Sequence, residues 1–245
     1  QFFDNRIVGA GNVIEYNNNA AFTDDLIYVS TVRFVTYSMI AAWLDTHEKH
    51  AYMHRPQSVL NYSGASQWGY YQIAATTDDN GLTIPVQEQL GCRVTDVGRN
   101  PSSGGKRKVC FMSGVHASED IGTEALLYAI DWLLSGNSTG TVEQAEAYDL
   151  LAWCDFYVYP TTNPGRYRHH TYGFSDSTVG GSDYQSNGHW DDVRPFAQPW
   201  HEAVAAAVDI DLPNGTEHML LDFHAQTNDS DTVEVWGNAI DTDLT

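Results

Sequence analysis

The stretch from Lys108 to Leu134 constrains the fold most, because its hydrophobic pattern changes period once along its length. Val109 to Met112 is an uninterrupted apolar run of strand length, and Ser113-Gly114 follows as a turn. From Glu119 onward, apolar residues recur at the three- and four-residue spacing of a helix. An apolar strand, a turn and an amphipathic helix in this order predict the first half of a crossover unit in an α/β sheet.

Two residues with metal-binding side chains lie where this strand gives way to the helix. His116 and Glu119 are three positions apart, so they can share one face of a first helical turn. Zinc binds neutral imidazole nitrogen and carboxylate oxygen. The same pair is common on ordinary protein surfaces, and Glu119 also suits the positive end of a helix dipole. A third ligand is therefore needed to support a metal site.

A second apolar strand, predicted from Met219 to Phe223, ends in His224. The carboxyl ends of parallel strands open onto one edge of a sheet, so we expect His224 at the same edge as His116. With Glu119, the two histidines make a His₂Glu set, which is the ligand count of an open catalytic zinc site. Asp222 lies two residues earlier on the same strand face, either as an acceptor for the His224 imidazole or as a structural residue.

The remaining pattern predicts an α/β domain without internal repeats. Residues 1–34 are polar and are predicted to be an irregular segment, and residues 35–245 form one domain. Gly136 is expected to cap the helix that ends at Leu134. Helices are predicted over 35–50, 119–134, 142–153 and 200–208, and strands over 57–62, 69–75, 109–112, 155–160, 219–223 and 232–236. The strand–helix–helix–strand order in the centre predicts neighbouring parallel strands joined by crossover helices.

Composition argues against two classes of partner. The 12 Lys and Arg residues against 32 Asp and Glu give a net charge of −20, which repels a phosphate backbone and disfavours nucleic acid. No apolar run approaches the roughly eighteen residues of a membrane helix. The start at Gln1 and the acidic surface lead us to expect a secreted protein in an extracellular or saline setting. Glycosylation is expected at the Asn-x-Ser/Thr sequons of Asn61, Asn137, Asn214 and Asn228.

The three cysteines allow two interpretations. Cys110 and Cys154 lie in apolar strands and are simply buried, or they bridge and leave Cys92 free.

A basic cluster of four residues follows Thr162-Asn-Pro-Gly165, namely Arg166, Arg168, His169 and His170. Its guanidinium groups can polarise a carbonyl or hold a carboxylate, and the alternative is a basic loop that balances nearby acids.

Together these motifs resemble the zinc carboxypeptidase family typified by carboxypeptidase A. The matching pieces are His116-Ala-Ser-Glu119 with the helix from Ala125 to Leu133, then Thr162-Asn-Pro-Gly165, then Leu221-Asp-Phe-His224, and earlier Tyr37–Leu44 and Ser63–Ile73. The resemblance implies a twisted, mixed and mostly parallel eight-stranded sheet flanked by helices. It also implies one zinc ion held by His116, Glu119 and His224, and removal of the C-terminal residue of a peptide. Arg168 is the best match for the arginine that polarises the scissile carbonyl, with Arg166 as competitor.

The chain departs from the family pattern in two places. The region Gly181–Asn187 stands where the family has an Asn-Arg carboxylate clamp and contains no arginine, so either Arg194 or another group replaces the clamp or the specificity differs. The family's general-base glutamate lies farther beyond the third ligand than the 21 residues present here (245 − 224). Glu234 comes too early, so no base is assigned and the C-terminal part of the domain is expected to be missing.

Three functions remain open at this point. The first is a peptide carboxypeptidase, and the second is a deacylase of N-acyl amino acids with the same fold. The third is a non-enzymatic metal-binding or structural module.

Overall fold

The computed structural model describes residues 6–8, 14–16, 35–73, 76–77, 83–84, 87–100, 105–115, 120–163, 199–213, 217–225 and 233–239. The chain divides into two compact units, Gln1–Val32 and Arg33–Thr245. In the first unit, β1 (Arg6–Val8) and β2 (Ile14–Tyr16) pair antiparallel, in a segment that the sequence predicts to be irregular. All the other elements belong to the second unit.

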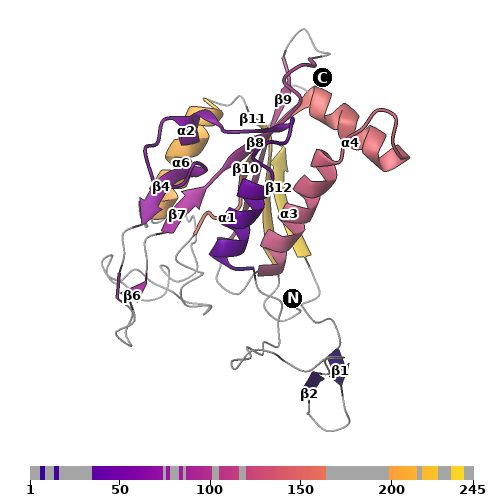
Figure 1. Cartoon of the computed structure of the whole chain (residues 1–245). Coiled ribbons are helices and arrows are strands. Elements are labelled where there is room, and N and C mark those ends of the chain that lie inside the picture. The colour runs from indigo at the N-terminus through magenta and orange to yellow at the C-terminus, as the bar shows by residue number, and fades with distance from the viewer. Residues whose placement is uncertain are drawn as a thin grey trace. The chain divides into compact units, whose positions relative to one another are not determined.

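A mixed sheet is the centre of the second unit, and its described strands run in the order β12-β11-β9-β10-β8-β3. The three central strands, β11 (Glu217–Ala225), β9 (Arg107–Ser113) and β10 (Cys154–Tyr159), are parallel. The outer strands, β12 (Val233–Ala239), β8 (Cys92–Val94) and β3 (Met53–His54), pair antiparallel. The predicted α/β fold with a mixed sheet is confirmed, and its parallel pairings lie at the centre (Figure 1).

Helices cover both faces of this sheet (Figure 1). α3 (Asp120–Leu134) and α4 (Val142–Trp153) connect β9 to β10, which confirms the predicted crossover. They share a core cluster with α1 (Tyr37–Thr46), to which β9 contributes Val109 and Phe111. The other cluster contains α2 (Gln57–Leu60), α6 (Pro199–Asp211) and the alternate β9 residues Cys110 and Met112. This alternation is the two-residue period of a strand buried on both faces.

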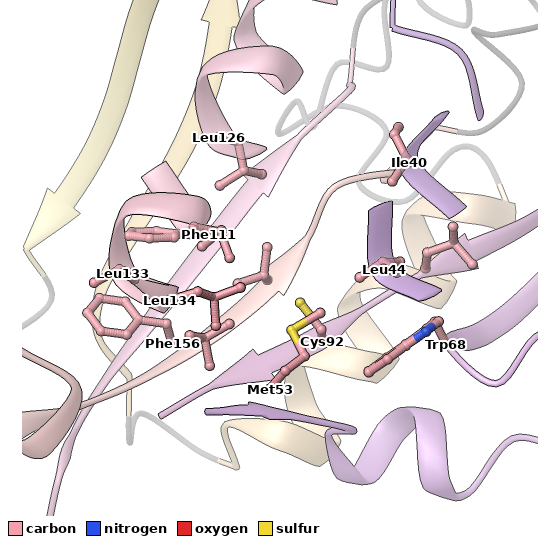
Figure 2. Packing of buried hydrophobic residues seen from close by; sticks show 14 of the residues in the cluster. Ile40, Leu44, Met53, Trp68, Cys92, Phe111, Leu126, Leu133, Leu134 and Phe156 are labelled. Carbon is pink, nitrogen blue, oxygen red and sulfur yellow. The ribbon is translucent and has the colours of Figure 1, made fainter. Parts of the chain in front are cut away.

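Phe111 belongs to the first cluster and lies among Leu126, Leu133 and Leu134 of α3 (Figure 2). Its ring centroid lies 5.3 Å from that of Phe156 on β10 and 5.6 Å from that of Phe223 on β11. Each buried aromatic side chain of this kind contributes about 1.5–3 kcal/mol by leaving water. One aromatic contact on each side therefore favours the order β11-β9-β10.

A buried carboxylate joins three elements on the opposite face. Asp211, at the end of α6, accepts hydrogen bonds from the backbone N of Ser58 at 2.8 Å, from Ser58 Oγ at 2.5 Å and from Tyr159 Oη at 2.8 Å. The Asp211 residue is only 5% exposed. Burial of a carboxylate is unfavourable unless hydrogen bonds replace its hydration, and these donors supply them.

Two features of the N-terminal half differ from the sequence prediction. Residues 57–60, predicted as strand, form helix α2, where Ser58 is held by Asp211. β7 (Gln87–Leu90), which pairs with the predicted strand β4 (Gly69–Ile73), is unpredicted because most of it is polar. Glu88 is nonetheless buried, and its carboxylate accepts hydrogen bonds from the backbone N of Ala65 and of Ser66, both at 2.7 Å. A short hairpin, β5 (Thr76–Thr77) with β6 (Thr83–Ile84), lies between β4 and β7 in sequence.

Gly136 does not cap α3 in the expected way, because positive φ angles among the described glycines are confined to Gly105 and Gly114. A Cβ at Gly136 would lie 2.9 Å from the backbone N of Tyr148, so the glycine allows α4 to approach closely.

The three cysteines are free thiols, which excludes the bridge between Cys110 and Cys154. Among the described residues, no helix has the length and apolar character to span a bilayer.

Candidate functional site

The predicted site lies at the carboxyl ends of the central parallel strands. The register of β11 with β9 pairs Asp222 with Met112 and Phe223 with Ser113. His224 is therefore one residue beyond the last pairing of these two strands, at the end of β11. This is the edge of the sheet toward which parallel strands open.

The His224 imidazole is held by Asp222. Asp222 Oδ2 lies 2.8 Å from His224 Nε2, and both side chains lie on one face of the strand, about four-fifths buried. The predicted role of Asp222 as an acceptor for His224 is thus realised as a contact. The other carboxylate oxygen of Asp222 is buried and has no hydrogen-bond partner among the residues that the structure describes. Metal-binding histidines are commonly oriented by a carboxylate in this manner.

The chain leaves β9 through a left-handed turn. Gly114 has φ of 77°, a conformation that residues with a Cβ adopt only at a cost, and Val115 after it is buried. Ser113 is fully buried at the end of the strand. This turn directs the backbone from the sheet into the segment that begins with His116.

The turn after β10 continues the ladder between β10 and β9 beyond its last strand pair, Tyr159 with Met112. Thr162 donates to the Ser113 carbonyl from its backbone N at 3.3 Å and from Oγ1 at 2.7 Å. Asn163 donates to the Gly114 carbonyl from its backbone N at 3.1 Å and to the Val115 carbonyl from Nδ2 at 3.0 Å. Sequence reasoning identified Thr162 and Asn163 as part of a turn and of the family resemblance, without a contact to the end of β9. A polar pair directly after a buried strand was the available signal.

Helix α3 approaches the end of β11 at Gly122. A Cβ there would lie 2.7 Å from the Phe223 carbonyl oxygen and 3.0 Å from the His224 carbonyl carbon. Only glycine permits this backbone separation, so the first turn of α3 lies directly against the His224 backbone. Sequence reasoning overlooked Gly122, although an isolated glycine inside an amphipathic helix was a signal of close packing.

Several predicted site residues lie outside the described part of the chain. They are His116, Glu119, Arg166, Arg168, His169, His170, Gly181–Asn187 and Arg194. Among the described residues, which do not include His116 and Glu119, there is no group of three or more metal-binding side chains. The structure thus places His224, its acceptor Asp222 and the segments next to His116 and Glu119.

A protein-family model described as zinc carboxypeptidase matches residues 71–212, which is more than half of the 245 residues. The chain belongs to the zinc carboxypeptidase family. The range that matches this family includes His116 and Glu119 and ends 12 residues before His224 (224 − 212). The predicted family is confirmed.

Solved zinc carboxypeptidase-like structures are similar to this family member at low sequence identity. A metallo-carboxypeptidase from Burkholderia cenocepacia is 15% identical with a TM-score of 0.48, over 82% of this chain and 43% of that one. One from Pseudomonas aeruginosa is 16% identical with a TM-score of 0.48, over 80% and 41%. Carboxypeptidase A from Helicoverpa armigera is 15% identical with a TM-score of 0.46, over 79% and 46%. The chain thus spans less than half the length of these proteins. No curated protein matches it.

Proposed function

We propose that this member of the zinc carboxypeptidase family binds one Zn²⁺ through His116, Glu119 and His224 and removes C-terminal residues from peptides. One arrangement in the described structure supports the proposal. Phe223 pairs with Ser113, and the backbone of Phe223 and His224 lies against Gly122. The end of β11 therefore adjoins both segments of chain that lead to the other two ligands.

Chain length keeps these ligands within reach of His224. His116 follows Ser113 by three residues, which span at most about 11 Å when fully extended. Glu119 directly precedes α3, whose first turn contains Gly122. The proposal therefore requires no change in the described segments, because each of the other two ligands is only a few residues away from one of them.

The contact between Asp222 and His224 fits a metal ligand. When a neutral imidazole donates its Nε2 proton to a carboxylate, the lone pair is on Nδ1, which is the nitrogen that would coordinate zinc. A bound zinc ion supplies Lewis acidity, which polarises a carbonyl and lowers the pKa of water. The buried surroundings of Asp222 strengthen the orienting hydrogen bond, because fewer water molecules compete for it.

The remaining roles in this proposal come from the family resemblance. Arg168, or its neighbour Arg166, polarises the scissile carbonyl, and the general base is not assigned within this chain. The substrate is a peptide with a free C-terminus. Secretion and glycosylation remain predictions of the sequence.

Metal content and substrate preference test the proposal together. The purified chain should contain about one zinc per molecule by elemental analysis, and His116→Ala and His224→Ala should each remove it. His50→Ala, which changes a histidine after α1, should retain it. The protein should hydrolyse blocked dipeptides faster than N-acyl amino acids. The reverse preference would favour the deacylase, and zinc binding with no hydrolysis of either substrate would favour the non-enzymatic module.

A further inference from the structure

The turn after β10 donates a hydrogen bond from Asn163 to the carbonyl of Val115, the residue that precedes His116. We propose that Asn163 is a positioning residue for the metal ligand His116, acting through the carbonyl of Val115. This inference rests on the proposed function, in which His116 binds zinc. In this proposal Asn163 contributes to metal binding as well as to the structure of the turn.

The strand ladders on both sides of β9 end before this point. β10 pairs with β9 as far as Met112, and β11 pairs with it as far as Ser113. The carbonyls of Gly114 and Val115 therefore lie past the last strand pair on either side. Both accept a hydrogen bond from Asn163, one from its backbone N and one from its side-chain Nδ2. One residue thus fixes two successive peptide groups.

The second of these peptide groups is the one that contains the backbone N of His116. The Val115 carbonyl and the His116 N–H belong to one planar peptide unit, so a hydrogen bond to the carbonyl orients the whole unit. Gly114 has φ of 77° and no side chain to restrict its backbone. The Asn163 bonds supply the restraint that glycine lacks. A ligand displaced by about 1 Å loses its geometry, so this restraint matters for binding.

The turn is itself anchored to a different strand. Thr161 Oγ1 accepts a hydrogen bond from the backbone N of Leu90 at 2.6 Å, and Gln89 Nε2 donates to the Thr162 carbonyl. Thr161 and Thr162 are fully buried, and Asn163 is only 3% exposed. Strand β7 therefore holds the two residues that directly precede Asn163, so Asn163 can act as a fixed donor.

The substitution Asn163→Asp tests the donor without changing the size of the side chain. It places a carboxylate oxygen against the Val115 carbonyl, and Asn163→Ala removes the donor. For the purified full chain, we expect both variants to bind zinc about 10- to 100-fold more weakly in a chelator competition, as for other groups that orient metal ligands. The melting temperature of the zinc-free protein is measured in parallel, because a merely structural role would lower this quantity and leave the zinc dissociation constant unchanged.

Thr161→Val is the matched control, because it removes a buried hydrogen bond of the same turn that points to Leu90 instead of β9. It should lower the melting temperature and leave zinc affinity within about twofold. Folded Asn163 variants with wild-type zinc affinity would overturn the inference, and so would an equal loss in Thr161→Val. If Asn163→Asp and Asn163→Ala both fail to fold, Asn163→Ser carries the same comparison, because its shorter side chain places no amide donor against the Val115 carbonyl. A wild-type chain that binds no zinc would instead refute the proposed function, and the inference with it.

Discussion

Asp222 Oδ2 lies 2.8 Å from Nε2 of His224, two residues along the same strand. This distance is that of a direct hydrogen bond, and it fixes the orientation of the imidazole through a group on its own β-strand. No loop has to close to make it. The ring of the proposed ligand is therefore oriented by the most regular part of the fold.

Replacing Asp222 should weaken metal binding more than it weakens folding. In Asp222→Ala the imidazole loses its acceptor, and we expect the zinc dissociation constant to rise at least about tenfold. Chelator competition measures this quantity. Asp209→Ala, at an exposed position of α6, is the control and should bind zinc like the wild type. Equal affinities in the two variants would show that Asp222 does not orient a ligand.

Adding a methyl group at Gly122 should disturb the junction between α3 and β11. The new Cβ would lie 2.7 Å from a backbone oxygen, which cannot rotate away. We expect Gly122→Ala to reduce the free energy of unfolding by about 1–3 kcal/mol, even though alanine favours a helix by about 1 kcal/mol. Urea denaturation measures the change. Gly98→Ala is the comparison, because its Cβ would meet only the Asp96 side chain, at 3.2 Å, and it should change stability little.

The buried carboxylate of Asp211 should be a main contributor to stability on its face of the sheet. Asp211→Asn keeps one acceptor oxygen and replaces the other by a neutral NH₂ group, so the negative charge that strengthens the three bonds is lost. The expected loss is about 1–3 kcal/mol in urea denaturation. Asp209→Asn on the same helix should be neutral. Identical denaturation midpoints would show that the charge of this carboxylate contributes nothing net.

His54 should make the protein less stable as the solution becomes acidic. Burial lowers its pKa below the ordinary value of 6.5, and the Arg93 and Lys106 charges act in the same direction, against a hydrogen bond to the Thr95 carbonyl and the charge of Asp155. The unfolded chain therefore takes up a proton first, and stability falls as pH drops below about 6.5. His54→Gln keeps a donor for the Thr95 carbonyl and does not titrate. Its urea midpoint should fall less between pH 7.5 and pH 5.5 than that of the wild type, and parallel curves would contradict this.

Salt should stabilise a chain with a net charge of −20. Repulsion among surface carboxylates favours the expanded state, and the screening length shortens from about 10 Å at 0.1 M to about 3 Å at 1 M. We expect the melting temperature to rise by several degrees from 0.05 to 0.5 M NaCl and then to level off. A melting temperature independent of NaCl would show that the acidic groups are too far apart to repel.

Elements with one dominant period were predictable from the sequence. The apolar runs before Ser113 and His224 and the leucine face of α3 indicated the parallel centre of the sheet, because burial on both faces leaves a continuous apolar signal. Strand β7 was not predictable, since Glu88 is buried only because the backbone of a distant loop supplies its donors. The same applies to residues 57–60, where Asp211 holds Ser58 in a helix. For β7 and for residues 57–60, contacts with remote segments of the chain determine the secondary structure.

The residues of the candidate site also divide into those that the sequence predicts and those that only the structure shows. His224 was placed correctly by its strand, and Asp222 by the two-residue period of that strand. The contributions of Asn163 and Gly122 needed the structure, because each depends on one backbone atom of another element. Side-chain chemistry is visible in a sequence, and the separation between two backbones is not.

The pairing of Ser113 with Phe223 joins residues 110 positions apart (223 − 113), and this has a consequence for biosynthesis. While the chain is being synthesised, β9 can pair with β10 soon after α4 forms, but its other side stays open until β11 leaves the ribosome. During that interval an apolar central strand is an exposed sheet edge, which is a template for association with other chains. A nascent chain of this protein is therefore most in need of a chaperone between the synthesis of β10 and that of β11.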